Sequence, residues 1–230
     1  MAMSHDVAAA IERVRERIAL ACQRTGRDAS LVQLVSVSKG HPEELIRLAY
    51  DAGMRAFGEN YAQELAEKAS KLSDLPEIRW RFIGHLQRNK IKLIERARAT
   101  VDTVDSSRLA EAISTRAAAR GATVEVLVQV NIGDETQKSG CKPDEVPALV
   151  DAVRALPNVM LRGLMTVAPH LEDPEATRPF FAALRELAEA QGLPELSMGM
   201  THDLEQAVEE GSTMLRIGTA IFGPRPAMKP

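Results

Sequence analysis

The first 26 residues carry a helical pattern of apolar positions. The positions recur at intervals of three or four residues: Val7, Ile11, Val14, Ile18 and Cys22. This spacing places them along one stripe of an amphipathic helix. Ser4 or Asp6 precedes the stripe and can cap the helix, and Gly26 follows it, where a glycine commonly ends a helix. The pattern predicts a helix that must bury one face against another part of the fold.

After this helix, short runs rich in β-branched residues alternate with longer segments of helical spacing, and such runs are typical of strands. The eight predicted strands are 32–38, 54–58, 78–84, 100–105, 123–131, 159–165, 195–198 and 213–217. The predicted helices between them include 42–52, 61–72, 88–99, 107–119, 144–155 and 174–191. Strictly alternating strands and helices require parallel strands with right-handed crossovers.

Eight such units in 230 residues fit a closed α/β fold, the (β/α)8 or TIM barrel, better than an open sheet. Only residues 218–230 follow the last predicted strand, and three of them are proline, so they are too few for a covering helix. We therefore expect the N-terminal helix to cover the seam between the eighth and first strands. No linker interrupts the pattern, and residues 1–230 are expected to form a single domain.

Charge and composition exclude several classes of function. The chain has 29 basic and 32 acidic residues, and 3% of its residues are aromatic, so no strong surface for nucleic acid is expected. No signal sequence precedes the fold, and no apolar run approaches the length of a membrane span, which predicts a cytoplasmic location. Cys22 and Cys141 lie outside any Cys-x-x-Cys spacing, so we expect reduced, buried thiols and no metal site.

Lys39 stands directly after the first predicted strand, and barrel enzymes place their chemistry at this end of the strands. Strand alternation puts Lys39 on the same face as Val35 and Val37. If that face lines the barrel, burial lowers the pKa of the amine and leaves a neutral nucleophile that can attack an aldehyde. On spacing alone, a lysine that extends outward into solvent is the more common outcome.

The seventh and eighth predicted strands end in segments that combine glycine with hydroxyl side chains, 197–201 and 216–219. The loops after these two strands usually bind phosphate in barrel enzymes, because glycine lets backbone amides approach the oxygens. Two ordinary glycine turns are the alternative. Asn131 and Met165 end the fifth and sixth predicted strands, where we expect them to form walls of the site.

Five motifs follow one another along the chain. They are Val37-Ser38-Lys39, Phe57-Gly58-Glu59-Asn60, His85-Leu86-Gln87-Arg88-Asn89-Lys90, Ser197-Met198-Gly199-Met200 and Arg216-Ile217-Gly218-Thr219-Ala220-Ile221-Phe222-Gly223. Together they resemble the pyridoxal phosphate homeostasis proteins, and five motifs in one order are far more specific than any single one. The resemblance extends from the first helix to Gly223. It implies a barrel of fold type III, related to the N-terminal domain of bacterial alanine racemases.

The resemblance implies that pyridoxal phosphate is held as a Schiff base (an aldimine) on Lys39. The cofactor-binding residues that it implies are Lys39, Asn60, His85, Ser197, Thr201, Arg216, Gly218 and Thr219. Arg216 is expected to face the pyridine nitrogen. A guanidinium only donates hydrogen bonds, so that nitrogen stays unprotonated and the ring is a poor electron sink. From position alone, Asn60 and His85 could instead cap the helices that follow them.

Two departures from the family's pattern are visible. Gly40 and His41 follow Lys39 where threonine and another residue are expected, and Thr201 stands where serine is usual. Thr201 keeps a hydroxyl for the phosphate, whereas His41 adds a titratable group whose effect is not predictable from the sequence.

The resemblance favours a carrier that holds pyridoxal phosphate, maintains its intracellular level and passes it to apo-enzymes, with little or no catalysis. The alternative is an amino-acid racemase, which needs a second base opposite Lys39. Tyr50 and Tyr61 are the only tyrosines; both lie in predicted helices, and Tyr50 is expected well away from the mouth. A third class, a sugar-phosphate enzyme, would leave Lys39 and Arg216 without a role.

We also expect a monomer, with no membrane partner. The segment 133–141 is long enough to act as a lid over the mouth, and Lys138 within it could transiently capture departing cofactor.

Overall fold

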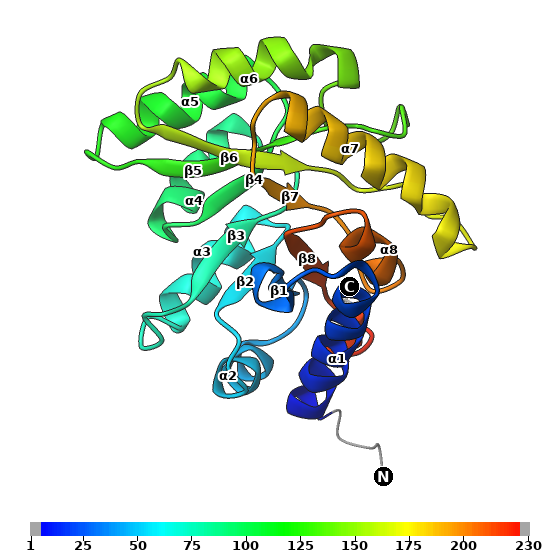
Figure 1. Ribbon diagram of the computed structural model, residues 1–230. Helices are drawn as coiled ribbons and strands as arrows, with labels where there is room; N and C mark the ends of the chain where they lie inside the picture. Colours follow the sequence, from blue (N-terminus) through cyan, green and yellow to red (C-terminus); the bar gives the residue numbers. More distant parts are fainter. Residues whose placement is uncertain (1–5, 226–230) are drawn as a thin grey trace.

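A closed barrel of eight parallel strands forms the centre of the molecule, as the computed structural model shows for residues 6–225 (Figure 1). The strands are β1 (Gln33–Val37), β2 (Ala56–Glu59), β3 (Arg79–Phe82), β4 (Thr100–Val104), β5 (Val124–Gln129), β6 (Val159–Met165), β7 (Glu195–Ser197) and β8 (Met214–Ile217). Each strand pairs with its neighbour in the sequence, and β1 closes the ring by pairing with β8 from Gln33 opposite Met214 to Ser36 opposite Ile217. The predicted barrel and its eight strands are confirmed.

Helices surround the ring. They are α1 (Val7–Thr25), α2 (Glu43–Asp51), α3 (Ala62–Lys71), α4 (Ile91–Arg96), α5 (Ser107–Ala118), α6 (Val146–Arg154), α7 (Arg178–Ala190), α8 (Leu204–Glu209) and α9 (Thr219–Phe222). Four 3-10 turns accompany them: η1 (Ala29–Leu31), η2 (Arg88–Lys90), η3 (Pro143–Glu145) and η4 (Pro174–Thr177). The predicted helices 88–99, 144–155 and 174–191 each begin with one of these turns, and α8 was not predicted.

Two apolar regions lie on opposite faces of the strands. The larger core fills the layer between the barrel and its helices, and includes buried side chains of α1. A small separate cluster of Val35, Ala56 and Met214 lies on the other face, inside the barrel. The interior also contains a buried ion pair, in which the Arg81 guanidinium donates two hydrogen bonds of 2.8 Å to Asp102. The barrel interior is therefore partly polar beneath its mouth.

The N-terminal helix α1 covers the seam between β8 and β1, as predicted. The side chain of Asp6 caps it by accepting a hydrogen bond from the Ala9 amide at 3.1 Å, and Gly26 ends it with φ of +68°. The alternative cap, Ser4, lies outside the described residues. Every member of the predicted apolar stripe is buried, and α1 packs against α2, α8 and α9 (Figure 1).

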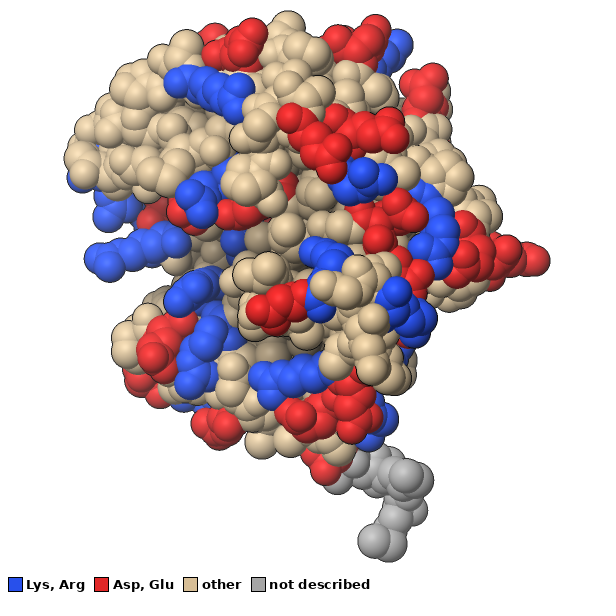
Figure 2. Space-filling view, viewed as in Figure 1, with Lys and Arg blue, Asp and Glu red and all other residues tan. Residues whose placement is uncertain are grey.

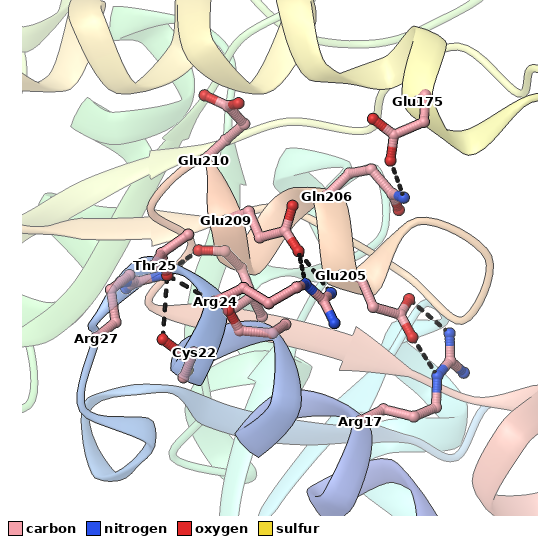
Figure 3. Close-up of polar contacts among 12 residues, drawn as sticks. Arg17, Cys22, Arg24, Thr25, Arg27, Glu175, Glu205, Gln206, Glu209 and Glu210 are labelled. Atoms are coloured by element: carbon pink, nitrogen blue, oxygen red, sulfur yellow. Dashed lines mark hydrogen bonds and ion pairs between the residues drawn. The ribbon is translucent and has the colours of Figure 1, made fainter.

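Ion pairs join α1 to α8 along this seam, as Figure 3 shows. Arg17 binds both carboxylate oxygens of Glu205, at 2.6 and 2.8 Å, and also donates to the Thr201 carbonyl at 3.2 Å. Arg24 lies 2.5 Å from Glu209. The helix at the start of the chain is thus attached by packing and by charge to the segment before β8.

Basic and acidic side chains are interspersed over the face drawn in Figure 2. None of the helices found between residues 6 and 225 has both the length and the hydrophobicity needed to cross a membrane. Cys22 and Cys141 are buried free thiols, which agrees with the expectation from their spacing.

Candidate functional site

The C-terminal ends of the strands enclose a cavity of about 460 Å³. Six of the eight predicted cofactor-binding residues line it: Lys39, Asn60, Thr201, Arg216, Gly218 and Thr219. These residues come from four different strand ends and are separated by up to 180 positions in the sequence. The barrel therefore brings into one cavity residues for which the motifs gave only their order along the sequence.

Lys39 lies on the wall of this cavity, with Val35 and Val37 preceding it on the inner face of β1. The side chain is partly buried, and within the described part of the chain its amine has no hydrogen-bond or ion-pair partner. Burial lowers the pKa of the amine below that of an ordinary lysine, and the nearby charge of Arg225 lowers it further. The outward, solvated lysine that spacing alone favoured is not what the structure contains.

Arg216 is 4% exposed and is fixed by two hydrogen bonds. It donates to the Ser197 hydroxyl at 2.7 Å and to the Thr166 carbonyl at 2.7 Å. Burial lowers the pKa of its guanidinium to about 10, which still leaves it charged at neutral pH. A guanidinium has five N–H donors, so donors beyond these two bonds are available toward the cavity that Arg216 lines.

Ser197 is fully buried and does not line the cavity. Its hydroxyl accepts the hydrogen bond from Arg216, so the structure assigns it a different contact from the direct phosphate contact implied by the resemblance. That implied role of Ser197 stays a prediction.

The turn after β8 has little room for side chains on one side. A Cβ added to Gly218 would lie 3.2 Å from the Val37 carbonyl oxygen, which is closer than ordinary packing allows. Thr219 begins α9, and the first amides of a helix have no acceptor within that helix. Glycine at 218 therefore allows β8 to approach β1 at the rim and leaves N–H groups near the cavity.

A second, smaller chamber of about 180 Å³ adjoins the cavity and shares Asn60 and Met165 with it. His85 and Asn131 line this chamber and not the Lys39 cavity. His85 is exposed, and its Nδ1 lies 3.2 Å from the Ser139 hydroxyl. Neither Asn60 nor His85 caps a helix: α3 and η2 begin after Tyr61 and Gln87, without side-chain caps.

Lys138, in the segment 133–141, is held by contacts inside and outside that segment. Its amine donates to the Ala168 carbonyl at 2.9 Å and lies 2.6 Å from the Glu135 carboxylate. Asn131 fixes the same segment, because its side-chain oxygen accepts a hydrogen bond from the Glu135 amide at 3.2 Å. Transient capture of cofactor by Lys138 stays a prediction, and it requires these contacts to break.

Several residues that line the cavity lie outside the predicted set of cofactor-binding residues. Arg225 lies beyond the last motif, in a segment without a periodic pattern. His170 and His202 come from two different loops, and their ring centroids lie 5.7 Å apart. His41 is buried against the Phe222 ring at 5.3 Å. No local pattern distinguishes Arg225, His170 or His202 from other loop residues, because only the closed ring brings them to the cavity.

Comparison with known proteins agrees with this arrangement. Residues 10–226 match the family model described as alanine racemase, N-terminal domain. The chain is 43% identical over 221 residues to a protein of Aquifex aeolicus named pyridoxal phosphate homeostasis protein, covering 94% of this chain and 96% of that protein. A protein of Pseudomonas aeruginosa with the same name is 45% identical, covering 95% and 96%.

The chain belongs to the pyridoxal phosphate homeostasis protein family. The resemblance inferred from the five motifs is thereby confirmed, as is the relation to the alanine racemase barrel. Among solved structures, PipY of Synechococcus elongatus PCC7942 with PLP bound is 37% identical and superposes with a TM-score of 0.79. The match covers 91% of this chain and 100% of that one, so this family member shares the whole barrel.

Proposed function

We propose that this chain binds pyridoxal phosphate in the cavity through a covalent bond to Lys39 and acts as a carrier that maintains the level of the free cofactor. The observation that supports this most directly is the unpartnered, partly buried amine of Lys39, which shares one cavity with the fixed cation of Arg216. The names of the relatives support the homeostatic role, and the PLP-bound PipY structure supports binding within this barrel.

The cofactor supplies an aldehyde that condenses with a primary amine, with loss of one water molecule. Lys39 supplies that amine, and its lowered pKa keeps a larger fraction neutral at neutral pH than for an exposed lysine. Arg225 and the low polarity of the partly buried site both contribute to this effect.

The opposite side of the cavity fits the anionic and ring portions of the ligand. We assign the phosphate to the amides of Gly218 and Thr219 and to the Thr201 hydroxyl, which all line the cavity. Arg216 is assigned to the ring nitrogen, where a permanent donor keeps that nitrogen unprotonated. Asn60 lies on the shared wall, within the same cavity, and is assigned to the ring side of the ligand.

An amino-acid racemase is the second candidate, because His170 and His202 line the cavity and could supply a second base. The tyrosines do not favour it. Tyr50 donates its hydroxyl to Glu77 at 3.0 Å, and Tyr61 is 57% exposed at the start of α3. The carrier is the better interpretation. We further propose that it acts as one cytoplasmic, monomeric domain that delivers the cofactor to apo-enzymes.

Borohydride reduction followed by mass spectrometry tests the covalent assignment. The protein incubated with pyridoxal phosphate should gain one pyridoxyl group on Lys39 and an absorbance band that reduction abolishes. Lys39→Ala should gain neither. A colourless protein, or a label on another residue, would contradict the proposal.

Incubation of the loaded protein with single-enantiomer alanine in deuterium oxide separates the two candidate functions. A carrier should leave the α-proton in place over many minutes. Rapid deuteration with inversion would establish the racemase instead.

A further inference from the structure

A buried ion pair lies directly behind Lys39, in the layer between the barrel and α3. Glu59 is the last residue of β2 and is fully buried, and the side chain of Lys68 from α3 is only 7% exposed. The two groups lie 2.7 Å apart. Removing two charges from water costs several kcal/mol each, and the attraction between them only roughly offsets this cost. An apolar pair of similar size is often at least as stable. Stability alone therefore does not explain why this layer contains charges.

The ammonium group of Lys68 uses all three of its donors. It donates to the Ser38 carbonyl oxygen, to Glu59 Oε1 and to Glu64 Oε1, each at 2.7 Å. These acceptors come from the end of β1, the end of β2 and the first turn of α3. Lys68 thus joins three separate segments at one point.

Both neighbours of Lys39 in the chain are bound to this cluster. Ser38 is held through its carbonyl oxygen and also through its hydroxyl, which donates to Glu59 Oε1 at 2.7 Å. Gly40 is held through its amide, which donates to Glu64 Oε1 at 2.6 Å. Gly40 also has φ of +73°, a conformation that favours glycine, so the chain turns sharply immediately after Lys39.

We propose that Lys68 and Glu59 are positioning residues that hold the backbone on both sides of Lys39 and so direct its amine into the cavity. Lys39 itself has four flexible side-chain bonds and no partner for its amine among the described residues, so its direction depends on where its backbone is fixed. This inference rests on the proposed function, because it concerns the approach of the amine to an aldehyde.

The charges of the cluster also act on the Lys39 amine. Burial and the charges of Arg225 and Arg216, which lie outside the cluster, lower the pKa of that amine, whereas Glu59 and Glu64 of the cluster raise it. His41, His170 and His202 line the same cavity. Removal of the Glu59 charge should therefore move the pH profile of amine reactivity toward lower pH, an effect that a purely structural role would not produce.

The test compares the rate at which apo-protein variants capture pyridoxal phosphate, followed by absorbance and by borohydride trapping. Lys68→Met should slow capture by about 10-fold to 100-fold, because small misplacements of a reacting group are costly. Lys68→Arg keeps a buried cation but not three convergent donors on one nitrogen, and should give an intermediate rate. Lys71→Met, one turn later on α3, removes an exposed pair with Glu43 and should leave the rate unchanged.

The double variant Glu59→Gln/Lys68→Met separates positioning from stability. Removing both charges leaves no unpaired buried ion, so urea unfolding should show more stability than for Lys68→Met alone. The capture rate should stay low. The single variant Glu59→Gln, which removes the carboxylate alone, should lower the midpoint of the pH profile relative to the wild type. Recovery of both stability and capture rate in the double variant would overturn the positioning role, as would wild-type capture kinetics in Lys68→Met.

Failure of the proposed function would look different. If the wild-type protein captured no pyridoxal phosphate, or if Lys39→Ala captured it equally well, the covalent assignment and this inference would both be wrong. If the wild type captured it on Lys39 and the Lys68 variants matched the wild type, only the positioning inference would be lost.

Discussion

The two basic side chains of the cavity, Arg216 at the end of β8 and Lys39 after β1, are held in opposite ways. On the β7 and β8 side, Arg216 is fixed through its side chain by hydrogen bonds to Ser197 and to the Thr166 carbonyl. On the β1 and β2 side, Lys39 has an amine without a partner in the described structure, and the contacts fall on the residues before and after it. A group that orients a ligand can be fully bound, whereas a group that must react has to stay free, so its backbone is held instead.

The two sides meet at the seam between β8 and β1, and the largest effect should follow from removing the helix that covers it. Deletion of residues 1–25 exposes apolar surface where α1 packed. Among the buried side chains that it removes are four large aliphatic ones, Val7, Ile11, Val14 and Ile18, each contributing about 1.5–3 kcal/mol. Because most domains are stable by only about 5–15 kcal/mol, the truncated chain should be unfolded by circular dichroism. A truncated chain with a native spectrum and a cooperative melt would show that the two sides hold together without α1.

The free energy of unfolding of the apo-protein should respond differently to substitution of Arg216 on one side of the cavity and of Lys39 on the other. Arg216→Leu leaves the Ser197 hydroxyl and the Thr166 carbonyl without their partner in a buried place, and should cost about 1–3 kcal/mol in urea unfolding. Lys39→Ala breaks no hydrogen bond or ion pair within residues 6–225 and should change stability by less than about 0.5 kcal/mol.

Arg47→Leu provides the matched control for that comparison, because Arg47 pairs with Asp74 on the surface. It should be nearly neutral, since exposed ion pairs contribute little. Equal losses of unfolding free energy in Lys39→Ala and Arg216→Leu would contradict the difference between an unbound Lys39 side chain and a hydrogen-bonded Arg216 side chain.

The smallest effect is expected from Arg225, which is exposed and lowers the pKa of Lys39 by its charge alone. Arg225→Gln should raise the pKa of that amine, so the midpoint of the capture rate against pH moves upward, opposite to the shift expected for loss of the Glu59 charge. The difference should shrink as salt is added, because the Debye length falls to about 3 Å at 1 M ionic strength. A downward shift, or one that salt does not affect, would contradict this role.

The barrel could be predicted from the sequence because each strand has a local pattern, a run of β-branched residues between turn residues. The helix α8 could not, since residues 204–209 are too short to show a helical period. Lys39 and Arg216 stand at strand ends, so alternation and the motifs located both. Lys68 is different: within α3 it resembles any solvated lysine, and its contact with Ser38 crosses 30 positions. Contacts between a helix and the strand it covers depend on packing that no local pattern encodes.

The covering of the seam between β8 and β1 by α1 also has a consequence for how the chain is made. Two of its partners, α8 and α9, are synthesised some two hundred residues after it, and β8 must be present before β1 finds its second neighbour. During translation the apolar stripe of α1 therefore stays without α8 and α9 until some two hundred further residues have been synthesised. Contacts between segments so far apart in the sequence also slow folding. The nascent chain should be most vulnerable to aggregation in that interval, and a chaperone that shields its first 25 residues would act at the right place.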